Sequence, residues 1–254
     1  GKTVTNAQGR YRHKDKNFIL VDLPGTYSLM ANSVEEEVAR DFVCFADPDA
    51  TVIVADATCL ERNLNLVLQT LEITGRAVVC VNLIDEAKRK RIRVDLQALS
   101  EQLGVPVVGT NARKGEGLDE LMDAVHAVSQ RPDTTPIRID YDETVEQAVA
   151  AVELAVGTAL QGRLSARWVA LKLIDEDQKL LAAMKKYLGF DLMDRPEVTA
   201  AVGEVQEMLR KADIGPEALR DRIVSRIVRR AEQICRQAVT FENDKYNQTD
   251  RRID

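Results

Sequence analysis

The first half of the chain alternates short apolar runs with longer helical patterns, and this alternation constrains the fold more than any other feature. Leucine and valine recur at helical spacing between the runs, and glycines such as Gly75 and Gly104 end the helical segments. Short, strongly apolar runs are typical of strands buried on both faces. Buried strands that alternate with helices predict a doubly wound parallel α/β sheet, which binds ligands at the carboxyl ends of its strands. The apolar runs are residues 18–21, 51–55, 77–81 and 105–108.

The second half of the chain has a different pattern. Residues 130–136, Gln-Arg-Pro-Asp-Thr-Thr-Pro, have the composition of a linker. No strand pattern is convincing after them, and there is no internal repeat. We therefore predict an α/β domain over residues 1–129, a linker over 130–140, an all-α helical domain over 141–240 and a last segment over 241–254. The helical patterns cover residues 144–160, 166–174, 177–188, 197–212 and 216–239.

Composition and charge exclude several classes of protein. The net charge of −6 argues against a protein that binds duplex nucleic acid by neutralising its phosphates. The 4 cysteines stand far apart, so neither a zinc-ligand pair nor a disulfide framework is expected. No His, Cys and carboxylate cluster has metal-ligand spacing, and we expect no iron site in this chain. No apolar run is long enough to cross a bilayer.

One polar motif follows the first predicted strand. Asp22-Leu23-Pro24-Gly25 comes directly after residues 18–21. A nucleotide hydrolase needs a carboxylate here to hold magnesium through a water, and a glycine whose N–H can approach a terminal phosphate. Asp22 and Gly25 are therefore candidate residues for magnesium and phosphate. A simple turn at the end of a strand is the alternative, since Asp-x-x-Gly alone is a common turn sequence.

A second motif, Asn82-Leu83-Ile84-Asp85, follows the predicted strand at 77–81. The Asp85 carboxylate can accept two hydrogen bonds from the N1 and N2 hydrogens of guanine. Adenine has no matching donors, so Asp85 would set base specificity. The Asn82 amide can support the loop and reach the N7 edge of the purine. The alternative is that Asn and Asp only end a strand and begin a helix, for which both are well suited.

A third motif, Thr-Asn-Ala-Arg-Lys-Gly at residues 110–115, follows the predicted strand at 105–108. A backbone N–H near Ala112 could donate to guanine O6, which makes Asn111, Ala112 and Arg113 candidate nucleotide-binding residues; an ordinary polar loop is the alternative. Each motif is weak alone. All three follow predicted strands in one order, and their conjunction predicts a GTPase-type domain that binds GTP or GDP with magnesium.

Three longer strings resemble ferrous iron transport protein B, the FeoB family. They are Asp-Leu-Pro-Gly-Thr-Tyr-Ser-Leu at 22–29, Glu-Val-Ala-Arg-Asp at 37–41 and Asp-Ala-Thr-Cys-Leu-Glu-Arg-Asn-Leu at 56–64. The last is the most specific, because general small GTPases do not carry it. The resemblance continues more weakly through the helical half, around Trp168. It implies a GTPase domain followed by a helical domain that stabilises bound GDP, with residues 241–254 leading to a first membrane helix.

The resemblance also bears on residues 1–5, Gly-Lys-Thr-Val-Thr. Gly-Lys-Thr would end a phosphate loop, but such a loop continues at once into an apolar helix, and the residues that follow here are typical of a strand or loop. The string resembles instead the family's first switch region. We therefore expect the Thr3 hydroxyl to bind magnesium and its N–H to meet the γ-phosphate, and we expect the phosphate loop to lie upstream of Gly1.

The resemblance also indicates how the water that attacks GTP is positioned. Thr26 stands where many GTPases carry a glutamine that orients this water. The resemblance implies that backbone groups position the water instead, so Thr3 and Gly25 are the candidate catalytic residues. Potassium is a further cofactor that the family uses, partly through an asparagine of the phosphate loop.

The resemblance implies a GTP-hydrolysing switch that is coupled to ferrous iron uptake, at the cytoplasmic face of the inner membrane. The implied partners are guanine nucleotide and the membrane-embedded part of the same transporter, with a homo-oligomer as a further expectation and no nucleic acid. Two alternatives remain. One is a soluble GTPase of the ribosome- or tRNA-maturation type, and the other is an interaction module that binds no nucleotide.

Some residues outside the motifs also carry expectations. His13 lies in the charged segment 10–16 and is expected to be a solvated hairpin residue, and His126 is expected on a helix surface. The last predicted helix allows two interpretations: a solvated amphipathic helix of a bundle, or a helix near anionic lipid headgroups. The arginines that line it are Arg220, Arg222, Arg226, Arg229, Arg230 and Arg236.

Overall fold

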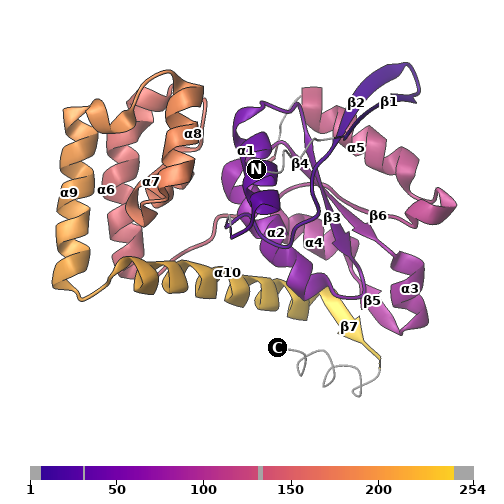
Figure 1. Cartoon of the computed structure of the whole chain (residues 1–254). Helices are drawn as coiled ribbons and strands as arrows, with labels where there is room; N and C mark the ends of the chain where they lie inside the picture. The colour runs from indigo at the N-terminus through magenta and orange to yellow at the C-terminus, as the bar shows by residue number, and fades with distance from the viewer. Residues whose placement is uncertain (1–6, 31, 131–133, 243–254) are drawn as a thin grey trace.

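The computed structural model describes residues 7–30, 32–130 and 134–242 (Figure 1). Its centre is a three-stranded parallel sheet in the order β3-β4-β6. The register sets Asp56 of β3 beside Asn82 of β4, so the polar ends of these strands lie at one edge of the sheet. The predicted fold class, a parallel α/β sheet followed by a helical domain, is confirmed. The strands are β3 (Thr51–Asp56), β4 (Ala77–Asn82) and β6 (Val107–Gly109).

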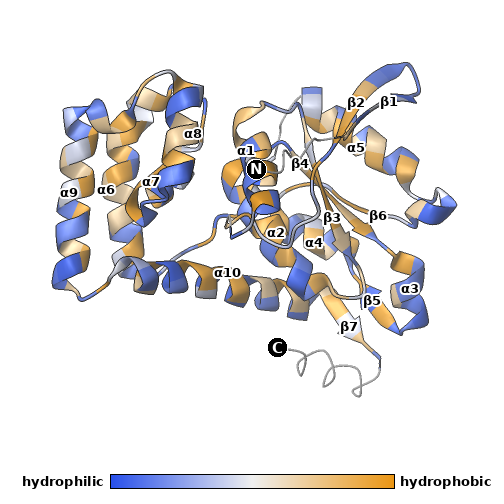
Figure 2. Cartoon of the chain, viewed as in Figure 1, coloured by the Kyte–Doolittle hydropathy of each residue, from blue (hydrophilic) through white to orange (hydrophobic). Residues whose placement is uncertain are grey.

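Helices cover both faces of this sheet. Alternate strand residues such as Ile53 and Val79 share one hydrophobic cluster with α2 (Leu60–Ile73) and α4 (Leu96–Leu103). Val78, which points to the other face, packs with α5 (Leu118–Gln130). The strands of this sheet are predominantly hydrophobic in Figure 2, as a sheet covered on both sides requires.

The N-terminal strands form a separate hairpin. β1 (Ala7–His13) pairs antiparallel with β2 (Lys16–Asp22), and no strand of the parallel sheet pairs with either in the described residues. The side chain of Ile19 is 72% exposed and that of Leu20 46% exposed. The prediction of a buried parallel strand at residues 18–21 is therefore wrong. A short apolar run does not distinguish a buried strand of a parallel sheet from one arm of an exposed hairpin, because the run itself does not show which strand it pairs with.

The tip of this hairpin docks on α5. His13 is only 6% exposed, and its Nε2 atom lies 2.8 Å from Oδ1 of Asp123. The Lys14 ammonium pairs with the same carboxylate at 2.8 Å, and the Phe18 ring meets His126 edge-on. The expectation that His13 is solvated is wrong. A charged local sequence predicts exposure, but the aspartates that receive this histidine lie on a helix more than a hundred residues away.

Residues 134–242 form five α-helices after α5, and their bounds lie within a few residues of the predicted ones. Asp142, Ser165 and Asp177 cap three of them, each accepting a backbone hydrogen bond from the first turn. Trp168 is buried in their core. Across the described parts of the chain, no helix combines the length and apolarity that a membrane span requires. The helices are α6 (Glu143–Leu160), α7 (Ala166–Asp175), α8 (Gln178–Leu188), α9 (Pro196–Lys211) and α10 (Pro216–Ala238), with a short 3₁₀ turn at Leu192–Asp194.

The last helix returns to the α/β domain. α10 packs against α2 and α4, and in Figure 1 it runs beneath both halves of the molecule. It continues into β7 (Val239–Phe241), which pairs antiparallel with β5 (Ile92–Val94). A strand after the last helix was not predicted, because three residues are too few for an alternating pattern to be recognised.

The arginines of α10 hold neighbouring segments. Arg220 pairs with the buried carboxylate of Asp175 at 3.1 Å, and Arg222 pairs with Asp142 at 3.1 Å. Arg226 donates to the backbone oxygen of Asp140 at 3.0 Å. These three side chains therefore anchor α7 and the approach to α6, as an amphipathic helix packed in a bundle does, and a location near anionic lipid headgroups stays a prediction.

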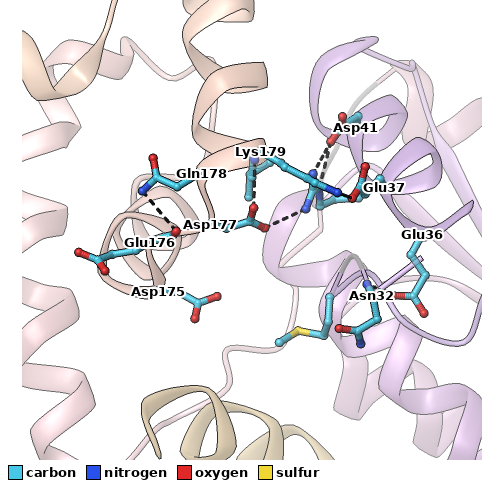
Figure 3. Close-up of polar contacts among 12 residues, drawn as sticks. Asn32, Glu36, Glu37, Asp41, Asp175, Glu176, Asp177, Gln178 and Lys179 are labelled. Carbon is cyan, nitrogen blue, oxygen red and sulfur yellow. Dashed lines mark hydrogen bonds and ion pairs between the residues drawn. The ribbon is translucent and has the colours of Figure 1, made fainter. Parts of the chain in front are cut away.

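A polar contact ties α1 (Val34–Phe45) to the start of α8 (Figure 3). Arg40 is buried, and its guanidinium donates to Asp41 at 3.0 Å and to Asp177 at 3.0 Å. Lys179 forms an ion pair with Glu37 beside it. Because a buried guanidinium needs its carboxylate partners, this contact fixes α1 against the helical half.

The end of the linker, at Ile139, is held by Arg167, which also pairs with Glu146. Arg167 donates two hydrogen bonds to the Glu146 carboxylate, at 2.9 and 2.6 Å, and a third to the Ile139 carbonyl. The Tyr141 N–H donates to the same carboxylate at 2.8 Å. Burial alone would raise the pKa of Glu146, but these hydrogen bonds lower it to about 2. The contacts that join the end of the linker to α6 and α7 therefore favour the ionised form of Glu146.

We predict that Glu146→Gln destabilises the protein at neutral pH by about 2 kcal/mol. A carboxyl whose pKa is lowered by folding contributes stability above its unfolded pKa, and this contribution is lost as the pH falls towards the folded value. The difference between wild type and variant should therefore shrink between about pH 4.5 and about pH 2. Urea unfolding across this range measures it, with Glu143→Gln on the exposed face of α6 as the control. A difference that stays constant down to pH 2 would contradict the assignment.

Candidate nucleotide-binding site

The loop after β4 has an unusual backbone. Leu83 adopts a left-handed conformation with φ of 62°, directly before α3 (Ile84–Arg89). Such a conformation is uncommon for a bulky side chain and needs support from its surroundings. Asn82 supplies it, since its Oδ1 atom accepts hydrogen bonds from the Thr110 hydroxyl at 2.9 Å and from the Ala112 N–H at 3.0 Å. The second and third predicted motifs therefore form one hydrogen-bonded cluster.

Asp85 belongs to this cluster. Its backbone N–H donates to Oδ1 of Asn111 at 2.8 Å, which holds the second residue of the third motif against α3. One carboxylate oxygen of Asp85 accepts from the Glu86 N–H at 2.9 Å, and the other lies 2.8 Å from the Lys114 ammonium. The hydrogen bond from Lys114 lowers the pKa of Asp85. Lys114 thus favours the ionised form of Asp85, and each of the two carboxylate oxygens already has one donor.

Two residues of this cluster were not chosen from the sequence. Thr110 is buried and connects β6 to Asn82, and Lys114 ends the short 3₁₀ turn Ala112–Lys114 and pairs with Asp85. Both belong to the third motif, but a hydroxyl and a lysine in a polar loop give no indication of their partners. Arg113, which was chosen, has an exposed side chain. The Ala112 N–H, also chosen, already donates to Asn82.

Among the described residues, no hydrogen bond or ion pair joins the first motif to this cluster. Asp22 ends β2, is exposed, and has no ion-pair or hydrogen-bond partner for its carboxylate within residues 7–30, 32–130 and 134–242. A Cβ added at Gly25 would meet no atom within 4 Å, and the backbone there is not left-handed. Neither packing nor conformation therefore requires glycine at this position. The space above the Gly25 backbone is open. Thr3 lies outside the described residues.

The side chains around Asp22 fit the ligand requirements of magnesium better than those of a transition metal. Among the described residues no group of three or more His, Cys, Asp and Glu side chains could hold a metal ion. Magnesium needs only one or two carboxylates, because waters and phosphate oxygens complete its coordination. The exposed carboxylate of Asp22 meets that requirement.

The fold and the cluster together define a class of protein. Strands β4 and β6 of the parallel sheet end in polar loops that are hydrogen-bonded to each other. The Asp-x-x-Gly motif begins at the end of the β1–β2 hairpin, and a helical domain follows the sheet. This combination is typical of a GTPase-type domain. Family models agree with this: the model of ferrous iron transport protein B matches residues 1–125, and that of the FeoB cytosolic helical domain matches residues 141–240. The chain belongs to the FeoB family, and the alternative of a ribosome- or tRNA-maturation GTPase is wrong.

Individual relatives agree with the family models. A fusion protein of Fe(2+) transport protein A and the Fe(2+) transporter FeoB from Porphyromonas gingivalis is 38% identical over 194 residues, which cover 74% of this chain and 22% of the relative. The Fe(2+) transporter FeoB of Escherichia coli is 32% identical, covering 70% of this chain and 23% of the relative. The chain therefore spans less than a quarter of the length of these curated relatives.

Solved structures show the same arrangement. The cytosolic domain of the T. maritima FeoB iron transporter in its GMPPNP form superimposes with a TM-score of 0.73 at 31% identity, covering 94% of this chain and 87% of that one. The cytosolic domain of L. pneumophila FeoB has a TM-score of 0.74 at 23% identity, which supports the fold.

We predict that Lys114→Gln raises the pKa of Asp85 towards its ordinary value, because the hydrogen bond from the ammonium is the largest cause of its lowering. An NMR titration of the Asp85 carboxyl carbon measures this. Lys88→Gln, an exposed lysine on α3, is the matched control and should leave the titration unchanged. An unchanged pKa in the Lys114 variant would show that the ion pair does not form in solution.

Proposed function

We propose that this chain is the GTP-binding and GTP-hydrolysing switch module of a ferrous iron transporter. The observation that carries the proposal is the cluster of Asn82, Asp85 and Ala112 at the carboxyl ends of β4 and β6, where α/β sheets bind ligands. The T. maritima relative has been solved in GDP and GMPPNP forms, which supports guanine nucleotide as the ligand.

Base recognition is assigned to the loops after β4 and β6. The Asp85 oxygens accept from N1 and N2 of guanine, and Asn82 holds the loop and reaches the N7 edge. The side-chain oxygen of Asn111 orients Asp85 by accepting a hydrogen bond from the Asp85 backbone N–H. Because the Ala112 N–H already donates to Asn82, we assign the next N–H, that of Arg113, to guanine O6.

Phosphate and magnesium are assigned to the first motif and to the N-terminal segment. Asp22 holds magnesium through a water, Thr3 binds it directly, and Gly25 offers its N–H to the γ-phosphate across the open space above its backbone. Magnesium supplies neutralisation of the phosphate charge that develops during hydrolysis. Thr3 and Gly25 position the attacking water through backbone groups, since Thr26 replaces the usual glutamine. Potassium is a further proposed cofactor.

The proposed role places residues 1–129 as the GTPase domain, 130–140 as the linker, 141–240 as the helical regulatory domain and 241–254 as the connection to the membrane part. The module would lie at the cytoplasmic face of the inner membrane, with the membrane-embedded part of the transporter as its partner and a homo-oligomer as a possible assembly. Nucleotide state would be transmitted through α1, which begins shortly after Gly25 and contacts the helical half through Arg40.

We predict that Asp85→Asn changes the base preference from GTP towards xanthosine triphosphate, because the xanthine C2 oxygen accepts a hydrogen bond from the new amide. Binding of fluorescent GTP, GDP and xanthosine nucleotides is measured with the chain alone and with the chain joined to a phosphate loop ahead of Gly1. Asp221→Asn, an exposed change on α10, is the control. Unchanged guanine selectivity would remove Asp85 from the site, and no nucleotide binding by either protein would favour the interaction-module alternative.

We predict that Thr3→Ala slows single-turnover GTP hydrolysis by about tenfold or more while GDP affinity stays nearly unchanged. The reason is that the proposed contact is made to the γ-phosphate, which GDP lacks, and a ligand shifts a switch only through contacts that differ between states. Gly25→Ala should behave alike, since its methyl group would crowd that phosphate. If GDP and GTP affinities fall equally, Thr3 belongs to a phosphate loop and the switch assignment is wrong.

A further inference from the structure

The segment that follows Asp-x-x-Gly is folded onto one glutamine of α2. Oε1 of Gln69 accepts a hydrogen bond from the Leu29 N–H at 2.6 Å and a second from the Ser28 hydroxyl at 3.2 Å. The Ser28 hydroxyl oxygen in turn accepts from the Met30 N–H at 3.0 Å. One side-chain oxygen thus orders three consecutive residues of an otherwise irregular segment.

The same network reaches back to Gly25. The Thr26 hydroxyl donates to the Ser28 carbonyl at 2.7 Å and accepts from the Ser28 N–H at 3.2 Å. Thr26 is the residue directly after the glycine that we assign to the γ-phosphate. The position of the Gly25 and Thr26 backbone therefore depends on a chain of hydrogen bonds that ends on Gln69.

Gln69 lies on a helix that is part of the core, and the Leu29 N–H has no easy substitute for it as an acceptor. Leu64, Val67 and Leu68 of α2 are fully buried, so the helix that carries Gln69 is part of the core. Leu29 is only 5% exposed, and an N–H in such a place that loses its acceptor cannot readily turn to water.

The face of α2 that carries Gln69 makes two further contacts. Seven residues earlier, the Arg62 guanidinium lies 4.2 Å from the centre of the Tyr27 ring. Three residues later, Glu72 accepts a hydrogen bond from the hydroxyl of Tyr141, the residue directly after the linker. Residues at these spacings share one helix face. The segment after Gly25 is thus held at two points by a face that also contacts Tyr141.

From this geometry we infer that Gln69 is a positioning residue for GTP hydrolysis, which rests on the function proposed above. It holds the segment after Gly25 so that the backbone N–H groups of Gly25 and Thr26 are preorganised for the γ-phosphate and the attacking water. It does not itself orient that water, because its amide oxygen is occupied by Leu29 and Ser28.

The first experiment needs no nucleotide. Gln69→Met keeps the length of the side chain and removes the acceptor, whereas Gln69→Glu keeps an acceptor for two donors. Amide hydrogen exchange should be about tenfold faster at Leu29 in the Met variant and close to wild type in the Glu variant. Gln97→Met on the exposed face of α4 is the control. Unchanged exchange at Leu29 in Gln69→Met would overturn the inference.

The second experiment separates positioning from simple support of the fold. In the chain joined to a phosphate loop, Gln69→Met should slow single-turnover hydrolysis by about tenfold with GDP affinity within about twofold of wild type, and Gln69→Glu should restore the rate. Equal losses in hydrolysis and GDP affinity, or no loss, would overturn the role of Gln69 alone. Wild-type protein that binds no guanine nucleotide would instead overturn the proposed function, and the hydrolytic role with it.

Discussion

The packing of α10 against α2 is the contact on which the rest of the structure depends. The apolar stripe of α10 begins at Leu219 and ends at Ile234, both buried, and it faces α7 at one end and α2 and α4 at the other. Each such side chain contributes about 1.5–3 kcal/mol when fully buried. One hydrophobic cluster therefore runs from the parallel sheet into the helical bundle, and the two halves are joined by a core as well as by a linker.

Charged contacts then determine how the halves face each other. Apolar packing is non-directional, but a buried guanidinium such as that of Arg40 requires its carboxylates in defined places. Arg40 fixes α1 to the start of α8, Arg220 fixes α10 to α7, and Arg167 fixes the linker. Any movement of α1 relative to α8 would have to break or shift the pair between Arg40 and Asp177, so this contact couples the position of α1 to that of the helical half.

Features set by residues close together in the sequence could be predicted, and features set by distant partners could not. The parallel strands and the helices follow from periodicity and caps within a few residues: Ser33, for example, caps α1 by accepting a hydrogen bond from the N–H of Glu36. Asn82 and Asp85 could be chosen as candidates because motif order along the chain reports the order of strand ends, and their role in binding stays a prediction. His13, β7 and Lys114 could not be found this way, because each is defined by a partner far away in the sequence or by a geometry that a polar loop does not reveal.

The string at residues 56–64, which distinguished this chain from general small GTPases, has a structural explanation. Oδ1 of Asp56 accepts from both the N–H and the hydroxyl of Thr58, at 2.7 Å each, and turns the chain at the end of β3. Asn63 then donates to the Cys59 carbonyl at 2.9 Å and accepts from the Asp56 N–H at 3.3 Å. These bonds fix the rotation of α2 about its axis. The rotation decides which residues face the segment after Gly25, so the most characteristic string of the chain acts on the site through the helix it begins.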